Sequence, residues 1–104
     1  MSKPRGENEG WVVTDIRHQV TEPPMYKVIL HNDDYTTMDF VVMILEVVFH
    51  KNRGEAARIM MNVHRQGMGV AGIFTRDVAE TKIVIVHDLA RKNEHPLKCS
   101  LERA

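Results

Sequence analysis

The amino-acid sequence predicts a small α/β sandwich whose elements follow the order strand, helix, helix, strand, helix, strand. Short alternating apolar stretches, typical of strands, occupy positions 25–31, 69–74 and 97–101. Apolar residues at helical spacing, bounded by capping or turn residues, fill positions 37–50, 53–66 and 76–92. Strands that alternate with helices favour an α/β architecture, and with only three strands we expect the helices to cover one face.

The first strand, Met25–His31, leads into a polar turn, Asn32-Asp33-Asp34-Tyr35-Thr36-Thr37-Met38, which we call the acidic elbow. Asn and Asp favour turns because their side chains bond the nearby backbone. Thr36 is predicted as the N-cap of the first helix, with Asp39 as its capping-box partner three residues later. This helix, which reaches His50, is apolar on most sides, so it must be buried or present a partner surface.

The second helix is predicted to begin after Asn52, because Asn52 and Glu55 have the spacing of a capping box. Gly67 is expected to end it in a left-handed conformation. The next strand, Gly69–Phe74, contains two glycines, which indicates that another chain segment passes close to it.

The third helix is predicted to start after Thr75 and to run to about Lys92. Pro96 then breaks the chain before the last strand, Leu97–Leu101, in which apolar and polar residues alternate.

Residues 1–24 lack sustained periodicity and are predicted to form a flexible arm, while residues 25–104 form the domain. The pair Pro23-Pro24 separates the two parts. Trp11-Val12-Val13 is a small apolar island in this otherwise polar arm. The arm is either a ragged terminus or a segment that another protein grips.

Composition excludes several classes of function. The chain has 104 residues, 14 basic and 14 acidic, so it has no electrostatic footprint for nucleic acid. Its longest apolar run, Phe40–Leu45, is too short to span a membrane, and no signal-peptide core is evident at the N-terminus. Cys99 is alone, which excludes an internal disulfide and fits a reducing compartment. We therefore expect a soluble cytoplasmic protein.

The acidic elbow allows two interpretations. Asp33 and Asp34 can simply stabilise the N-terminus of the following helix, or they can form a polar cup for a cation or an amine. Met38, Met60 and Met61 would bracket this cup if the first two helices pack together, and Met is common at adaptable binding surfaces.

A metal site built from His31, Asp33, Asp34 and His64 is a weaker alternative, because their spacing matches no familiar ligand pattern. An Asp–His pair could also serve as acid and base in a small enzyme. A domain with an interaction surface and no pocket is the third possibility.

Four separated motifs together resemble the ClpS family. They are the start of the acidic elbow, the stretch Met60–His64 followed by Gly67, the run Val78–Lys82 and the stretch Asn93–Leu97. The resemblance covers roughly residues 24–104, and the motifs occur in the family's order. Members of this family are adaptors that deliver N-degron substrates to the ClpAP protease.

The resemblance implies a three-stranded antiparallel sheet packed on three helices, as in the C-terminal domain of the ribosomal stalk protein. It also implies a monomer without enzymatic activity, cofactor, metal, nucleic acid or membrane partner. Such adaptors bind substrates with N-terminal Leu, Phe, Tyr or Trp and dock on the N-terminal domain of the ClpA unfoldase.

Carried onto this chain, the resemblance implies that Asn32, Asp33 and His64 receive the substrate α-amine and that Asp34 and Thr36 shape the entrance. The side-chain pocket would be lined by Met38, Val41, Met60, Val63 and Leu97. The unfoldase-facing residues would be Tyr35, Asp77, Glu80 and Lys82. Three positions depart from the family pattern, namely Asp77 where Glu is expected, Thr37 where Pro is frequent, and Met61 beside Met60.

Overall fold

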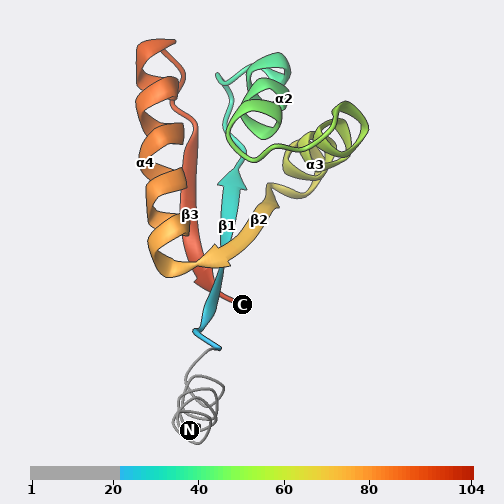
Figure 1. The fold of residues 1–104 in the computed structure, drawn as a ribbon. Helices are drawn as coiled ribbons and strands as arrows, with labels where there is room; N and C mark the ends of the chain where they lie inside the picture. Colours follow the sequence, from blue (N-terminus) through green and yellow to red (C-terminus); the bar gives the residue numbers. More distant parts are fainter. Residues whose placement is uncertain (1–21) are drawn as a thin grey trace, which may run out of the picture.

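The computed structural model describes residues 22–104, which form three strands and three helices in the predicted order (Figure 1). The elements are β1 (Met25–His31), α2 (Met38–Val47), α3 (Arg53–Gln66), β2 (Met68–Thr75), α4 (Arg76–Lys92) and β3 (Lys98–Arg103). Most of the predicted arm, residues 1–21, lies outside the described residues, so its flexibility remains a prediction.

The three strands form one antiparallel sheet in the order β2-β1-β3, which confirms the predicted sheet. The first strand is central, and Val28, Ile29 and Leu30 are almost completely buried. β1 and β2 are paired from Met25 to His31, and the register of this pair shifts once, between Val28 and Ile29. The central strand therefore ends, and the acidic elbow begins, where both neighbours are still in register.

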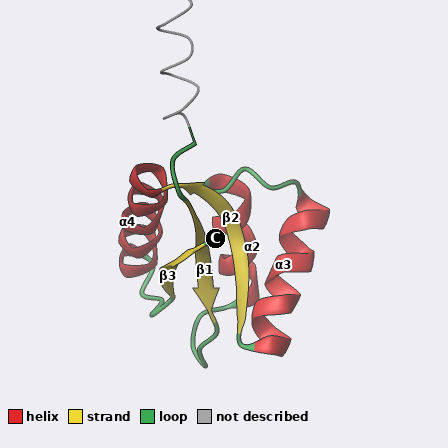
Figure 2. Ribbon diagram, turned by 90° about the horizontal axis from the view of Figure 1, so that it is seen from below, coloured by secondary structure: helices red, strands yellow, loops and turns green. Residues whose placement is uncertain are grey.

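The helices cover one face of the sheet, as expected. α4 contacts all three strands, and α3 packs against β2 and α2. Figure 2 shows α4 beside β3, α3 beside β2, and α2 behind the sheet. Val28 and Leu30 point into this side and join one core with residues from every helix, among them Ile44, Ile59 and Val86. The opposite face, here called the outer face, carries none of the helices of residues 22–104.

The first helix begins one residue later than predicted. Its N-cap is Thr37, whose hydroxyl oxygen accepts the backbone N–H of Phe40 at 3.1 Å. The assignment of Thr36 as the cap is therefore wrong, because the Thr36 hydroxyl is bonded inside the elbow to Asp33. The helix also ends at Val47, three residues earlier than predicted, and His50 adopts a positive φ of 57° just beyond it.

The boundaries of the second helix are confirmed. The Asn52 side chain accepts the backbone N–H of Glu55 at 2.8 Å, and Gly67 has a φ of 88° in the left-handed region. The Glu55 carboxylate, however, accepts a bond from Arg58, so the predicted reciprocal half of the capping box is replaced by an ion pair. Thr75 precedes the third helix as predicted, but its side chain makes no capping hydrogen bond.

Gly69 explains why α3 can lie so close to the sheet. A Cβ atom on this residue would lie 2.9 Å from Cγ2 of Val63 and 3.2 Å from the carbonyl oxygen of Ile59. Both residues belong to α3, so the predicted close approach of another segment is confirmed. This contact sets the position of the helix that carries Met60 and His64.

We predict that Gly69→Ala destabilises the domain by about 1–3 kcal/mol, the usual cost of an extra methyl group in a packed interior. Gly54→Ala is the matched control, because nothing lies closer than 3.6 Å to a Cβ at this helical position. Gly54→Ala should instead stabilise the domain by about 0.5–1 kcal/mol, because alanine favours a helix more than glycine does. Urea unfolding midpoints of the two variants measure both effects, and equal midpoints would contradict the packing role of Gly69.

Candidate functional site

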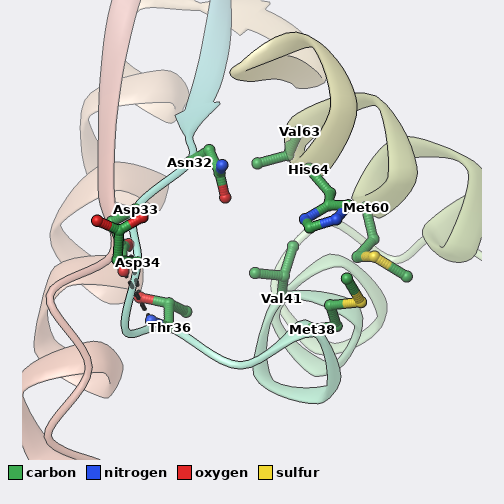
Figure 3. Close-up of a pocket in the computed structure, with 9 residues that line it drawn as sticks. All are labelled: Asn32, Asp33, Asp34, Thr36, Met38, Val41, Met60, Val63 and His64. Atoms are coloured by element: carbon green, nitrogen blue, oxygen red, sulfur yellow. Dashed lines mark hydrogen bonds between the residues drawn. The ribbon is translucent and has the colours of Figure 1, made fainter.

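A cavity of about 260 Å³ opens between the acidic elbow, the first turn of α2 and the last turns of α3 (Figure 3). Nine of the ten predicted substrate-binding residues line it, from three separate parts of the chain. They are Asn32, Asp33, Asp34, Thr36, Met38, Val41, Met60, Val63 and His64. The elbow residues that were interpreted as a polar cup therefore do line a cavity.

The polar side of the cavity is made by Asn32, Asp34 and His64. Figure 3 shows the side chains of Asn32 and His64 pointing toward one another from the elbow and from α3. The backbone N–H of Asn32 donates to the carbonyl oxygen of Gly67 at 2.9 Å, which ties the elbow to the end of α3. Within residues 22–104, the side chains of Asn32, Asp34 and His64 have no hydrogen-bond partner, so their polar atoms are free for a ligand.

Asp33 has a different role from its neighbour. Its Oδ1 accepts the backbone N–H groups of Tyr35 at 2.8 Å and Thr36 at 2.6 Å, and its Oδ2 accepts the Thr36 hydroxyl at 2.7 Å. Burial alone would raise the pKa of this carboxyl, but the hydrogen bonds from Thr36 and Tyr35 outweigh burial and lower the pKa. Asp33 thus closes the elbow on itself.

The apolar side of the cavity comes from two helices. Val41 of α2 and Val63 of α3 are buried and form its fixed wall. Met38 is 43% exposed and Met60 is half-buried, so both methionines are nearer to solvent than the two valines. Flexible thioether side chains at the rim of a concave apolar wall can adapt to bound groups of different shape.

Leu97 is the predicted pocket residue that the structure does not place on the cavity. It is only 3% exposed and belongs to the hydrophobic core, just before β3. Met61 is half-buried on α3 and does not line the cavity either. The resemblance implied a pocket role for Leu97, and the apolar alternation around it could not separate core from cavity, because both require apolar side chains.

The four predicted partner-facing residues do not form one patch. Tyr35 is 78% exposed in the elbow and lines a hollow together with Pro96, which follows the C-terminus of α4. Asp77 and Glu80 lie in the first turns of α4. The helix has 17 residues and is therefore about 25 Å long, so the two groups lie toward opposite ends of it.

Lys82 is occupied within the domain. Its ammonium group donates to the carbonyl oxygen of Val48 at 2.6 Å, at the end of α2, and lies 5.7 Å from the centre of the Phe74 ring. A cation at a helix C-terminus is favourable because of the helix dipole. Spacing in the sequence gave no sign of this contact, which joins residues 34 positions apart.

Two findings on residues 22–104 concern metal ligands and membrane spans. Residues 22–104 contain no group of three or more His, Cys, Asp or Glu side chains arranged to hold a metal ion. His31, one of the metal candidates, is bonded to the Ser100 hydroxyl through Nε2 at 2.7 Å. The helices of this region are also too short or too polar to cross a membrane.

Comparison with known proteins identifies the family. The profile of the family described as "ATP-dependent Clp protease adaptor protein ClpS" matches residues 21–100. The chain belongs to the ClpS family. A ClpS adapter protein of Syntrophus aciditrophicus is 61% identical over 84 residues, which cover 81% of this chain and 78% of the relative. Another from Desulfatibacillum aliphaticivorans is 54% identical over 98% of both chains.

The solved structure of Agrobacterium tumefaciens ClpS2 bound to L-phenylalaninamide is also similar. It has a TM-score of 0.76 and 40% sequence identity, and the match covers 80% of this chain and all of that one. The family resemblance and the fold predicted from the sequence are thus confirmed. The protein is a member of the adaptor family of the ATP-dependent Clp protease.

Proposed function

We propose that this ClpS-family protein binds polypeptides that begin with Leu, Phe, Tyr or Trp and delivers them to the ClpAP protease. The observation that carries the proposal is the cavity beside the elbow, where unbonded polar side chains stand next to an apolar wall. A free N-terminal residue carries two complementary groups within a few bonds of each other. Its α-amine can bond the polar side chains, and its side chain can contact the apolar wall. The ligand of the Agrobacterium relative, L-phenylalaninamide, has both.

The polar side chains suit a protonated amine. An α-amine has a pKa of about 8, so it is mostly charged at neutral pH and needs hydrogen-bond acceptors. Asn32 offers its amide oxygen, Asp34 a carboxylate, and neutral His64 an unprotonated ring nitrogen. We assign the carboxylate role to Asp34 rather than Asp33, because Asp33 already accepts three hydrogen bonds from its own elbow.

The apolar wall accounts for the choice of side chain. A cavity of about 260 Å³ gives room for one large apolar group, and Val41, Val63 and the two methionines surround it. Recognition of a terminal amine together with one anchoring side chain is an established mode of peptide binding. Contacts to the α-amine and contacts to the side chain of the terminal residue would both contribute to affinity.

We propose that the protein acts without catalysis. Burial raises the pKa of the Cys99 thiol to about 12, so this side chain is a poor nucleophile at neutral pH. Within the described residues no side chain holds the His64 ring in position, as a general base would require. The relatives are named adapter proteins, which agrees with a binding role.

Three peptides that differ only at the first residue test the proposal. A peptide that starts with Phe should bind saturably, whereas the same peptide with Ala first lacks the anchoring side chain and should bind weakly. The acetylated Phe peptide should also bind weakly, because acetylation removes the charge and crowds the amine. Equal affinity for the free and the acetylated Phe peptide would overturn amine recognition.

The two neighbouring carboxylates should respond differently to the same substitution. Asp34→Asn removes the charge that faces the amine, and charge-assisted hydrogen bonds contribute roughly 1.5–3 kcal/mol, so affinity should fall about ten- to a hundredfold. Asp33→Asn retains an Oδ1 atom that can accept both backbone N–H groups, so affinity should stay near that of the native protein. Calorimetry with the Phe peptide measures the affinity of each variant. A larger loss of affinity in Asp33→Asn than in Asp34→Asn would assign amine binding to Asp33.

Met38 is predicted to exclude residues that branch at the β-carbon. It lies at the first position of α2, where its side chain can pack against the first carbons of a bound side chain. An added methyl group in such a contact costs about 1–3 kcal/mol, which would exclude Ile and Val. Met38→Ala should therefore admit peptides that begin with Ile or Val and retain those with Leu. Loss of Leu binding without any gain for Ile or Val would make Met38 a simple wall.

Delivery requires a second contact, and we propose the N-terminal domain of ClpA as the partner of a monomeric adaptor in the cytoplasm. Asp77 and Glu80 are exposed on α4 and leave the peptide cavity open. Tyr35 is exposed beside the cavity, where it is available to a partner that also covers the bound substrate. Lys82 would support this surface from behind by holding the end of α2.

Residues 1–15 are predicted to matter for delivery rather than for binding, since this stretch is largely polar, lacks sustained periodicity and precedes the domain. A protein that lacks them should bind the Phe peptide with unchanged affinity and support slower degradation of a Phe-initiated substrate by ClpAP. Peptide binding by the truncated protein is the internal control. Equal degradation rates for the full-length and truncated proteins would contradict the prediction.

A further inference from the structure

The outer face of the sheet exposes an apolar stripe that no described helix covers. Met25, Met68, Val70 and Ile73 are between 40 and 51% exposed. In the register of the sheet, Ile73 lies opposite Lys27, Val70 opposite Ile29, and Met68 opposite His31, so the exposed β2 side chains follow one another along the strand. A contiguous exposed apolar patch of this kind usually marks an interaction site.

A hollow of about 450 Å³ lies against this stripe. Its floor includes Ile29, Met68 and Val70 of the sheet, and its wall is a stripe of α3 formed by Arg58, Asn62 and Gln66 at intervals of four residues. None of its lining residues lines the peptide cavity, so the two sites are separate. The volume falls within the range of sites that hold a large side chain or a small ligand.

Lys27 and Arg58 are the two cations that line the hollow. Arg58 is paired with Glu55 at 2.8 Å, and Glu102, which also lines the hollow, lies opposite Lys27 across β1 and β3. The chain itself contains an apolar segment that could cover this stripe, residues 7–16, which hold the island Trp11-Val12-Val13. Glu7, Glu9 and Asp15 lie in that segment, and it contains no Lys or Arg.

The segment is long enough to reach the hollow. Residues 22–24 lead directly into Met25 of β1, whose side chain belongs to the exposed stripe. The 14 residue steps from Trp11 to Met25 can span up to about 46 Å. The seven residues of β1 extend over only about 23 Å, so the segment can turn back along the whole face.

We infer that residues 7–16 of the same chain dock on the outer face, with the Trp11 indole in the hollow between β2 and α3. Apolar contact with the exposed side chains of Met68, Val70 and Ile73 holds the island, and Lys27 faces the acidic residues that flank it. Another exposed apolar patch, formed by Val78, Val84 and Ile85 of α4, is bordered by Asp77, Glu80 and Lys82. The inference does not depend on peptide binding.

Trp11 reports on this docking directly, because it is the only tryptophan in the chain. In the full-length protein its emission should lie at shorter wavelength than in a free peptide of residues 1–24, and acrylamide should quench it less. Val70→Glu places a negative charge on the floor of the hollow. It should shift the emission to that of the free peptide and raise the quenching to the same level.

Val84→Glu is the matched control, since it introduces the same change at an exposed valine on α4. It should leave the emission and the quenching as in the native protein. Lys27→Glu is a second variant in case Val70→Glu fails to fold, and it should release Trp11 by charge repulsion alone. Circular dichroism verifies the fold of each variant.

Three results would overturn the inference. The first is a native emission equal to that of the free peptide. The second is an equal release by Val84→Glu and Val70→Glu, which would indicate non-specific contact. The third is a loss of the wavelength shift on dilution, because Trp11 would then occupy the outer face of a second copy.

Discussion

One backbone hydrogen bond holds the two halves of the candidate site together. The N–H of Asn32 donates to the carbonyl of Gly67 at 2.9 Å, directly after the last register pair of β1 and β2, His31 and Met68. This bond continues the pairing of β1 and β2 by one step. It joins the first residue of the elbow to the residue that ends α3. The bond is possible because Gly67 adopts a left-handed conformation that turns α3 into β2. Asn32 and His64, which are distant in sequence, therefore line one cavity.

The polar residues of the elbow divide into those that satisfy one another and those left for a ligand. Asp33 and Thr36 bond each other, and Thr37 caps α2, so these three are spent on local structure. The side chains of Asn32 and Asp34 make no hydrogen bond within the described part of the chain. A turn closed by its own side chains can hold neighbouring acceptors in place before a ligand arrives, which reduces the ordering cost of binding.

The order of the elements could be predicted because apolar periodicity, capping residues and left-handed glycines leave clear local patterns. Most of the cavity residues were implied by the resemblance to the ClpS family. The sequence pattern misplaced the cap at Thr36 because two adjacent threonines offer the same chemistry, and only the backbone path decides which hydroxyl faces the helix. The resemblance placed Leu97 in the pocket, whereas packing puts this side chain in the core. The contact of Lys82 with Val48 depends on tertiary structure alone and has no local signature.

Recognition of a charged α-amine by the cavity, as proposed, is tested most directly by the pH dependence of peptide binding. The affinity of a Phe-initiated peptide should be compared with that of the same peptide in which a hydroxyl replaces the α-amine. Above the amine pKa of about 8, the affinity of the first peptide should fall roughly tenfold for each pH unit, as the charged form disappears. The hydroxyl peptide should bind weakly with little change over the same range. Parallel pH profiles for the two peptides would contradict the account.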